Sequence, residues 1–162
     1  MIPPNLRQPE YLHVVLNHLP TIGLAMGGLA LLIALLSRGT RRVSVPPLCI
    51  IALCAFAIWP VEETGEKAYK LIRAQLDDAG VDWLEAHEER AEKVIPAFFV
   101  LGGLSLAALF LPLKFPKAGK PLDIAVLILT FGCLAAGIWA ADAGGKIKHK
   151  EFRYGPPPAS DH

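Results

Sequence analysis

The sequence predicts an all-α integral membrane protein that folds as one four-helix bundle. Three observations lead to this prediction: 53% of the 162 residues are apolar, four long apolar runs are spread along the chain, and charged residues are largely confined to the segments between the runs. Each run approaches the roughly 20 residues that cross about 30 Å of hydrocarbon as a helix. The spans are expected at about 11–36, 45–61, 94–113 and 122–141, which leaves no separate soluble domain.

The first span, 11–36, opens with polar residues and is uncharged from Leu19 to Leu36. Its length and its early histidines, His13 and His18, distinguish it from a cleavable signal peptide, so we expect a retained span. Pro20 removes one helical hydrogen bond, which predicts a kink beside His18. The glycines of this span form a small-residue face on which another helix or a flat cofactor can pack closely.

The second span, 45–61, is followed by an outer amphipathic segment, 62–93, in which apolar residues recur at helical spacing. This segment is expected to continue the span or to lie on the bilayer surface. Gly80 should end its first helix and Asp82 should cap the next one. The second of these helices runs into the third span and places His87 about two turns above the hydrocarbon.

The charges between the spans predict the orientation of the bundle. The two short connections carry arginine or lysine and almost no acid, whereas segment 62–93 carries ten acids and five bases. Short connections rich in Lys and Arg stay in the cytoplasm. Both termini and segment 62–93 are therefore expected outside, in a multi-pass protein of the bacterial inner (cytoplasmic) membrane.

Four histidines are predicted to gather on the outer side: His13, His18, His87 and His149. Neutral imidazole is a common ligand of iron, copper and zinc. A haem takes one axial ligand on each face, and His18 and His87 are the first candidate pair, with His149 and His13 as substitutes or a second site. Polar neighbours are candidates to orient the imidazoles from a second shell: Asn17, Glu88 and Glu151.

Three interpretations of this cluster remain open: a haem b site, a copper or zinc site, and a hydrogen-bonded network without a cofactor. His13 and His18 are five residues apart and diverge by about 140° on a regular helix, so one small ion does not easily bind both. The sequence contains no glycine-rich phosphate loop, no Cys-x-x-Cys and no zinc-protease helix. We therefore assign no catalytic residue and leave open whether the protein is an enzyme.

The motifs around these histidines resemble those of a family of uncharacterised four-helix bacterial membrane proteins, whose first helix opens with His-Pro-x-x-x-His-Phe-Pro. The matching segments cover almost the whole chain: His13-x-x-x-x-His18-Leu-Pro20, Thr64-Gly-Glu66-x-Ala68, His87-Glu88-Glu89-x-Ala91 and Gly144-Gly145-x-Ile-x-His149-x-Glu151. Val14 departs from the family, which has proline at that place. The resemblance implies the four-helix fold and the outer histidines, and no particular reaction.

The leading functional expectation is an integral membrane b-type cytochrome-like subunit. Its haem near the periplasmic face would exchange electrons with quinol or with a periplasmic cytochrome, as part of a larger membrane redox complex. The first alternative is a non-catalytic structural subunit of a respiratory or photosynthetic complex, and the second is copper or zinc binding at the same face. Lipid and other subunits are the expected partners in every case, and nucleic acid is not expected.

Overall fold

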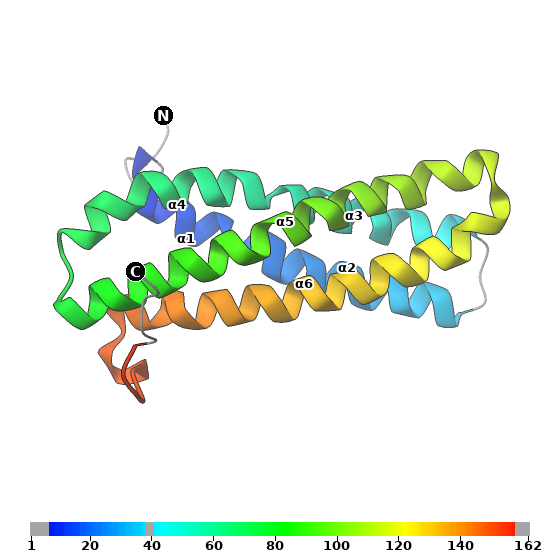
Figure 1. Cartoon of the computed structure of the whole chain (residues 1–162). Helices are drawn as coiled ribbons and strands as arrows, with labels where there is room; N and C mark the ends of the chain where they lie inside the picture. Colours follow the sequence, from blue (N-terminus) through cyan, green and yellow to red (C-terminus); the bar gives the residue numbers. More distant parts are fainter. Residues whose placement is uncertain (1–6, 38–40, 158–162) are drawn as a thin grey trace.

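The computed structural model describes residues 7–37 and 41–157, and all regular elements in these ranges are helical. The described residues form four long helical segments, which run side by side in the bundle (Figure 1). They consist of α1 (Pro9–Leu16) with α2 (His18–Leu36), η2 (Arg41–Ser44) with α3 (Val45–Phe56) and α4 (Ile58–Arg73), α5 (Asp78–Lys114), and η3 (Pro116–Ala118) with α6 (Gly119–Lys148). A last turn, η4 (Lys150–Phe152), follows α6.

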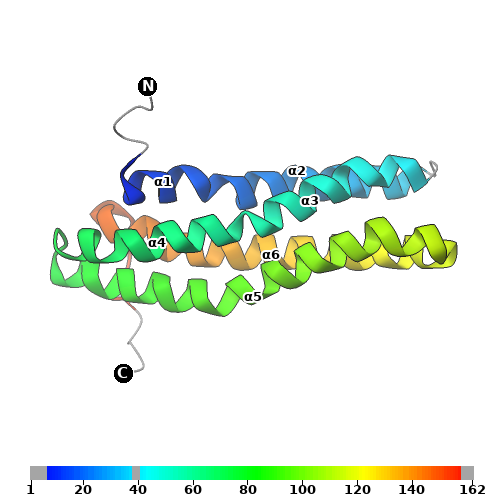
Figure 2. The same ribbon diagram turned by 90° about the horizontal axis from the view of Figure 1, so that it is seen from above.

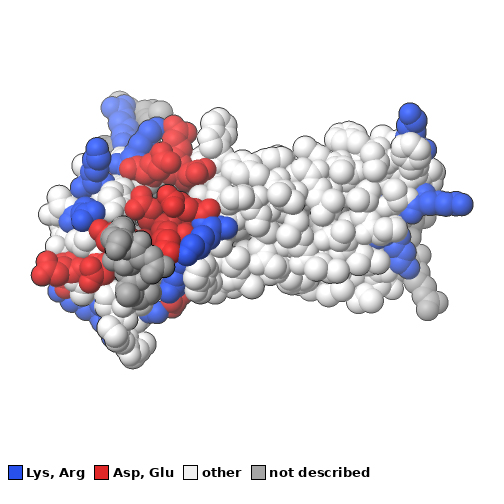
Figure 3. Space-filling model, in the orientation of Figure 1, with Lys and Arg blue, Asp and Glu red and all other residues white. Residues whose placement is uncertain are grey.

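All four segments contain helix that is long and apolar enough to cross a membrane. The all-α prediction and its number of apolar helices are thereby confirmed. The face drawn in Figure 3 shows a broad belt without charged side chains between two charged ends. One end carries acids and bases, and the other carries Lys and Arg. We name the first the outer end and the second the inner end, after the orientation predicted from the sequence.

The bundle is built from two antiparallel helical hairpins that lie one on the other (Figure 2). The first hairpin comprises α1 to α4 and the second comprises α5 and α6. Across the boundary, α2 packs on α6 and α3 packs on α5. The centre of the bundle is closed by fully buried apolar side chains: Leu24, Leu31, Leu48, Ile51, Leu101 and Val126. At the outer end, α1 packs along α4 and the start of α5 packs along the end of α6.

Prolines divide the two segments of the first hairpin. Helix α1 ends before Asn17, three residues ahead of Pro20, whose missing N–H leaves the carbonyl of Leu16 without its helical partner. In the same way α3 ends before Ala57, three residues ahead of Pro60. The helix is interrupted at Asn17, beside His18, where the kink was predicted, and each break lies between the core of the bundle and its outer end.

The outer helices differ from the prediction in where α5 begins. It starts at Asp78, capped by Asp77, whose carboxylate accepts a hydrogen bond from the backbone N–H of Gly80 at 3.1 Å. Gly80 and Asp82 therefore lie inside α5, so the predicted helix end and cap were wrong. Asp77 makes the contact typical of an N-cap, in which the side chain accepts from the N–H three residues later. Segment 62–93 continues the spans along the bundle axis (Figure 1).

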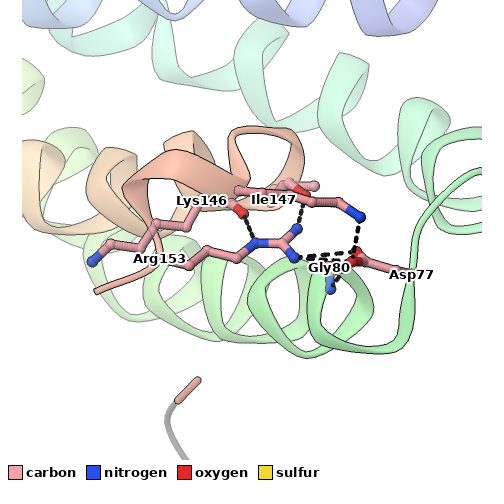
Figure 4. A network of polar contacts seen from close by, with 6 residues as sticks. Asp77, Gly80, Lys146, Ile147 and Arg153 are labelled. Atoms are coloured by element: carbon pink, nitrogen blue, oxygen red, sulfur yellow. Dashed lines mark hydrogen bonds and ion pairs between the residues drawn. The ribbon is translucent and has the colours of Figure 1, made fainter. Parts of the chain in front are cut away.

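Asp77 also holds the chain that follows α6 (Figure 4). Arg153 donates to the last carbonyls of α6, at 2.7 Å to Lys146 and 2.6 Å to Ile147, and lies 3.1 Å from Asp77. Lys150 approaches the same carboxylate at 2.8 Å. The hydrogen bond from Lys150 lowers the pKa of Asp77 most, and the hydrogen bond from Arg153 lowers it further. Together they hold this pKa well below its usual value. A lowered pKa means that Asp77 stabilises the fold above about pH 4, and that this contribution is lost as the pH falls towards its folded-state pKa.

The small-residue face of α2 serves helix packing, and this gives a first prediction. A Cβ on Gly27 would lie 2.7 Å from a side-chain carbon of Ile51, which is fully buried, and 3.5 Å from its backbone nitrogen. Gly27→Ala is therefore expected to destabilise the bundle by about 1–3 kcal/mol through overpacking. The matched control is Gly103→Ala, where an added Cβ meets nothing within 4 Å. Thermal unfolding of both variants in detergent should separate them, and equal stabilities would contradict the packing role of Gly27.

Candidate functional site

His13 lies on α1 at the outer end and is fixed by α4. Its Nδ1 is 2.9 Å from the backbone carbonyl oxygen of Val61. A carbonyl oxygen only accepts hydrogen bonds, so Nδ1 carries the proton in this contact. In the neutral ring the lone pair is then on Nε2, the nitrogen that remains available as a ligand.

His87 has the same environment in the second hairpin. It lies on α5, and its Nδ1 is 2.9 Å from the carbonyl oxygen of Ala140 on α6. The hydrogen bond again assigns the proton to Nδ1 and the lone pair to Nε2. Each hairpin therefore holds one histidine of its first segment against a backbone carbonyl of its second segment.

The two imidazoles lie next to each other, edge to face, across the boundary between the hairpins. Their ring centroids are 6.2 Å apart and their planes are inclined by 80°. If one metal ion were bound between the hairpins, His13 and His87 are the residues that would hold it at this separation. We refer to His13 and His87 as the imidazole pair.

The other two candidate ligands lie away from this pair. His18 is exposed, and its Nδ1 is 2.7 Å from the carbonyl oxygen of Val14 in the preceding turn. His149 follows α6, where its Nδ1 is 2.9 Å from Glu151 and its ring stacks on Phe152 with 5.0 Å between centroids. The structure therefore brings His87 together with His13, and not with His18, the first partner chosen from the sequence.

The proposed orienting residues are also dispersed. The junction between α1 and α2 is formed by Asn17, whose backbone carbonyl accepts a hydrogen bond from Thr21 at 3.1 Å. Glu88 is exposed and hydrogen-bonded to Tyr69 of α4, and Glu151 binds His149. For the imidazole pair, backbone carbonyls do the orienting. Sequence reasoning did not find these carbonyls, because every residue has one and no side chain marks those that bind a ring.

No family model matches the sequence, and no curated protein or solved structure matches it. Function must therefore be inferred from the site itself. The imidazole pair offers one Nε2 atom from each hairpin, on rings that hydrogen bonds to backbone carbonyls hold in place. A fixed positive charge lies close to it, since Arg90 is held by the carbonyl oxygen of Trp139 at 2.9 Å and by Asp142 at 3.4 Å.

Proposed function

We propose that this protein binds one b-type haem between His13 and His87 and transfers electrons at the outer face of a membrane. The observation that carries the proposal is the imidazole pair, with ring centroids 6.2 Å apart on opposite sides of the hairpin boundary. A haem takes one nitrogen on each face. The inclination of 80° is compatible with this, because two imidazoles that hold one haem need not be parallel.

The hydrogen bonds of the pair support haem binding in a second way. A ligating histidine usually donates its other ring N–H to a carbonyl or carboxylate, which fixes its tautomer and its direction. Both rings already make this bond, to Val61 and to Ala140. When bound, the haem would supply one-electron redox chemistry. The protein would hold the two ligands in register and keep their lone pairs directed towards the metal.

A membrane location is supported by the surface of the bundle. At most 39% of the residues in each apolar window are buried, so most of them are at least partly accessible at the surface of the bundle. We place the protein in the bacterial inner membrane with the imidazole pair towards the periplasm, because the basic connections lie at the opposite end. From this position the haem would exchange electrons with quinol in the outer leaflet or with a periplasmic cytochrome, within a larger redox complex.

A structural subunit without a cofactor is the second candidate. It is favoured by the same hydrogen bonds, since each one cross-links the two segments of its hairpin. Copper or zinc at the outer end is a third candidate. The imidazole pair supplies two ligands, which is the number a haem takes from a protein, whereas a structural zinc site takes four.

The test is the composition and spectrum of the protein purified from membranes in mild detergent. We expect about one haem iron per chain, with Soret and α bands that sharpen on dithionite reduction, and reduction by a soluble quinol analogue. Protein with neither haem nor metal, isolated from cells with ample haem, would leave the structural subunit. Stoichiometric copper or zinc without haem bands would establish the third candidate instead.

A further inference from the structure

The two half-sites of the imidazole pair share a third component, a glycine. In the first hairpin, Gly65 follows Val61 by one helical turn, and in the second, Gly144 follows Ala140 by the same four residues. Each glycine therefore lies on the helix face that also presents the carbonyl bonded to the histidine. One hairpin thus repeats the arrangement of the other: a histidine, a carbonyl and a glycine.

Both glycines touch the ring that their carbonyl holds. A Cβ added to Gly65 would lie 3.0 Å from Nδ1 and Cε1 of His13. A Cβ added to Gly144 would lie 3.1 Å from the same two atoms of His87. Contacts this short force the neighbour to shift by a few tenths of an ångström. The ring cannot shift freely, because its Nδ1 is bonded to the carbonyl one turn away.

The surroundings of the two glycines also correspond. In each case the residue two positions before the glycine forms an ion pair with the residue two positions after it. The pairs are Glu63 with Lys67 at 2.6 Å and Asp142 with Lys146 at 2.7 Å. By contrast Gly145, next in the chain, would meet nothing within 4 Å if it carried a Cβ. Close approach to a histidine ring is thus shared by Gly65 and Gly144 and is absent at Gly145.

We infer that Gly65 and Gly144 are positioning residues, each of which lets one imidazole lie against the opposite helix so that its Nδ1–H reaches the carbonyl. As positioning of haem ligands the inference rests on the proposed function. The positioning itself is a property of the protein without haem and is testable there.

The test is nitrogen NMR of histidine-labelled, haem-free protein in detergent, with ring signals assigned through His→Ala variants. Wild type should show the Nδ1–H tautomer and a hydrogen-bonded Nδ1–H at both His13 and His87. Gly65→Ala is expected to shift or remove the signal of His13 alone, and Gly144→Ala that of His87 alone. Gly145→Ala should leave both rings unchanged. Alanine favours helix over glycine, so the backbone of the variants is not weakened.

Each variant contains its own control, because the ring of the other hairpin reports that the bundle is folded. No change at either ring, or an equal change at both rings in both variants, would contradict the inference. The outcomes for haem remain separate. If the shifts occur but the wild type binds no haem, positioning stands and the proposed function fails. If haem binds but Gly65→Ala and Gly144→Ala leave the rings unmoved, the proposed function stands and positioning fails.

Discussion

Replacing either His13 or His87 by alanine is expected to abolish the six-coordinate haem spectrum, whereas His18→Ala and His149→Ala should preserve it. The reason is that the pair alone faces across the hairpin boundary, while His18 and His149 are exposed and bonded within their own segments. The measurement is the reduced-minus-oxidised spectrum of the four variants, compared at equal protein concentration.

A second measurement separates loss of a ligand from loss of the fold. Truncation to alanine leaves the space of a ring next to Gly65 or Gly144, so added imidazole should restore the six-coordinate spectrum in the variants of the pair. If His18→Ala lost the spectrum and His13→Ala kept it, the site would instead be built on the pair first chosen from the sequence.

The largest effect on stability is expected from Arg41→Ala at the inner end of the bundle. Asp123 is only 2% exposed, and its carboxylate is 2.9 Å from the guanidinium of Arg41. The same guanidinium donates to the backbone carbonyl of Ala108 on α5. Arg41 therefore joins three of the four segments. Its removal leaves a buried carboxylate without its countercharge, which costs about 3–5 kcal/mol.

The neighbouring arginine provides the control. Arg42 is exposed, so Arg42→Ala should change the free energy of unfolding by no more than about 0.5 kcal/mol. Combining Arg41→Ala with Asp123→Asn should recover part of the loss, because the amide carries no charge. Chemical unfolding in detergent measures all three variants. Equal stabilities of Arg41→Ala and Arg42→Ala would show that Asp123 does not depend on its partner.

The helices and their breaks were predictable from the sequence because they depend on local rules. Apolar length determined the four long helices, and Pro20 marked the break after α1 through its missing N–H. The start of α5 was not predicted, since several acids near Gly80 could act as a cap and only the three-dimensional contact distinguishes Asp77. Asp123 lies at the edge of an apolar run, and nothing in the residue pattern there indicates that it would be buried.

The sequence predicted that histidines would form the candidate site and on which side they would lie. It did not predict which two histidines lie together. His13 and His18 point about 140° apart on a regular helix, so only one of them can face a given neighbour, but residue spacing does not say which one does. In the structure, His18 faces outward while His13 reaches Val61. Such a choice depends on how α1 lies against α4, and this is a tertiary contact that residue spacing does not contain.

The imidazole pair lies at one end of the bundle and not at its middle, and this has an energetic consequence. A charge that moves through the whole membrane exchanges about 2.3 kcal/mol per 100 mV of membrane potential. If the proposed function holds, an electron that enters and leaves the haem held by His13 and His87 from the periplasmic side would cross almost none of that voltage. Energisation of the cell should therefore neither drive nor oppose its transfer, and any conversion into a proton gradient would have to take place in another subunit.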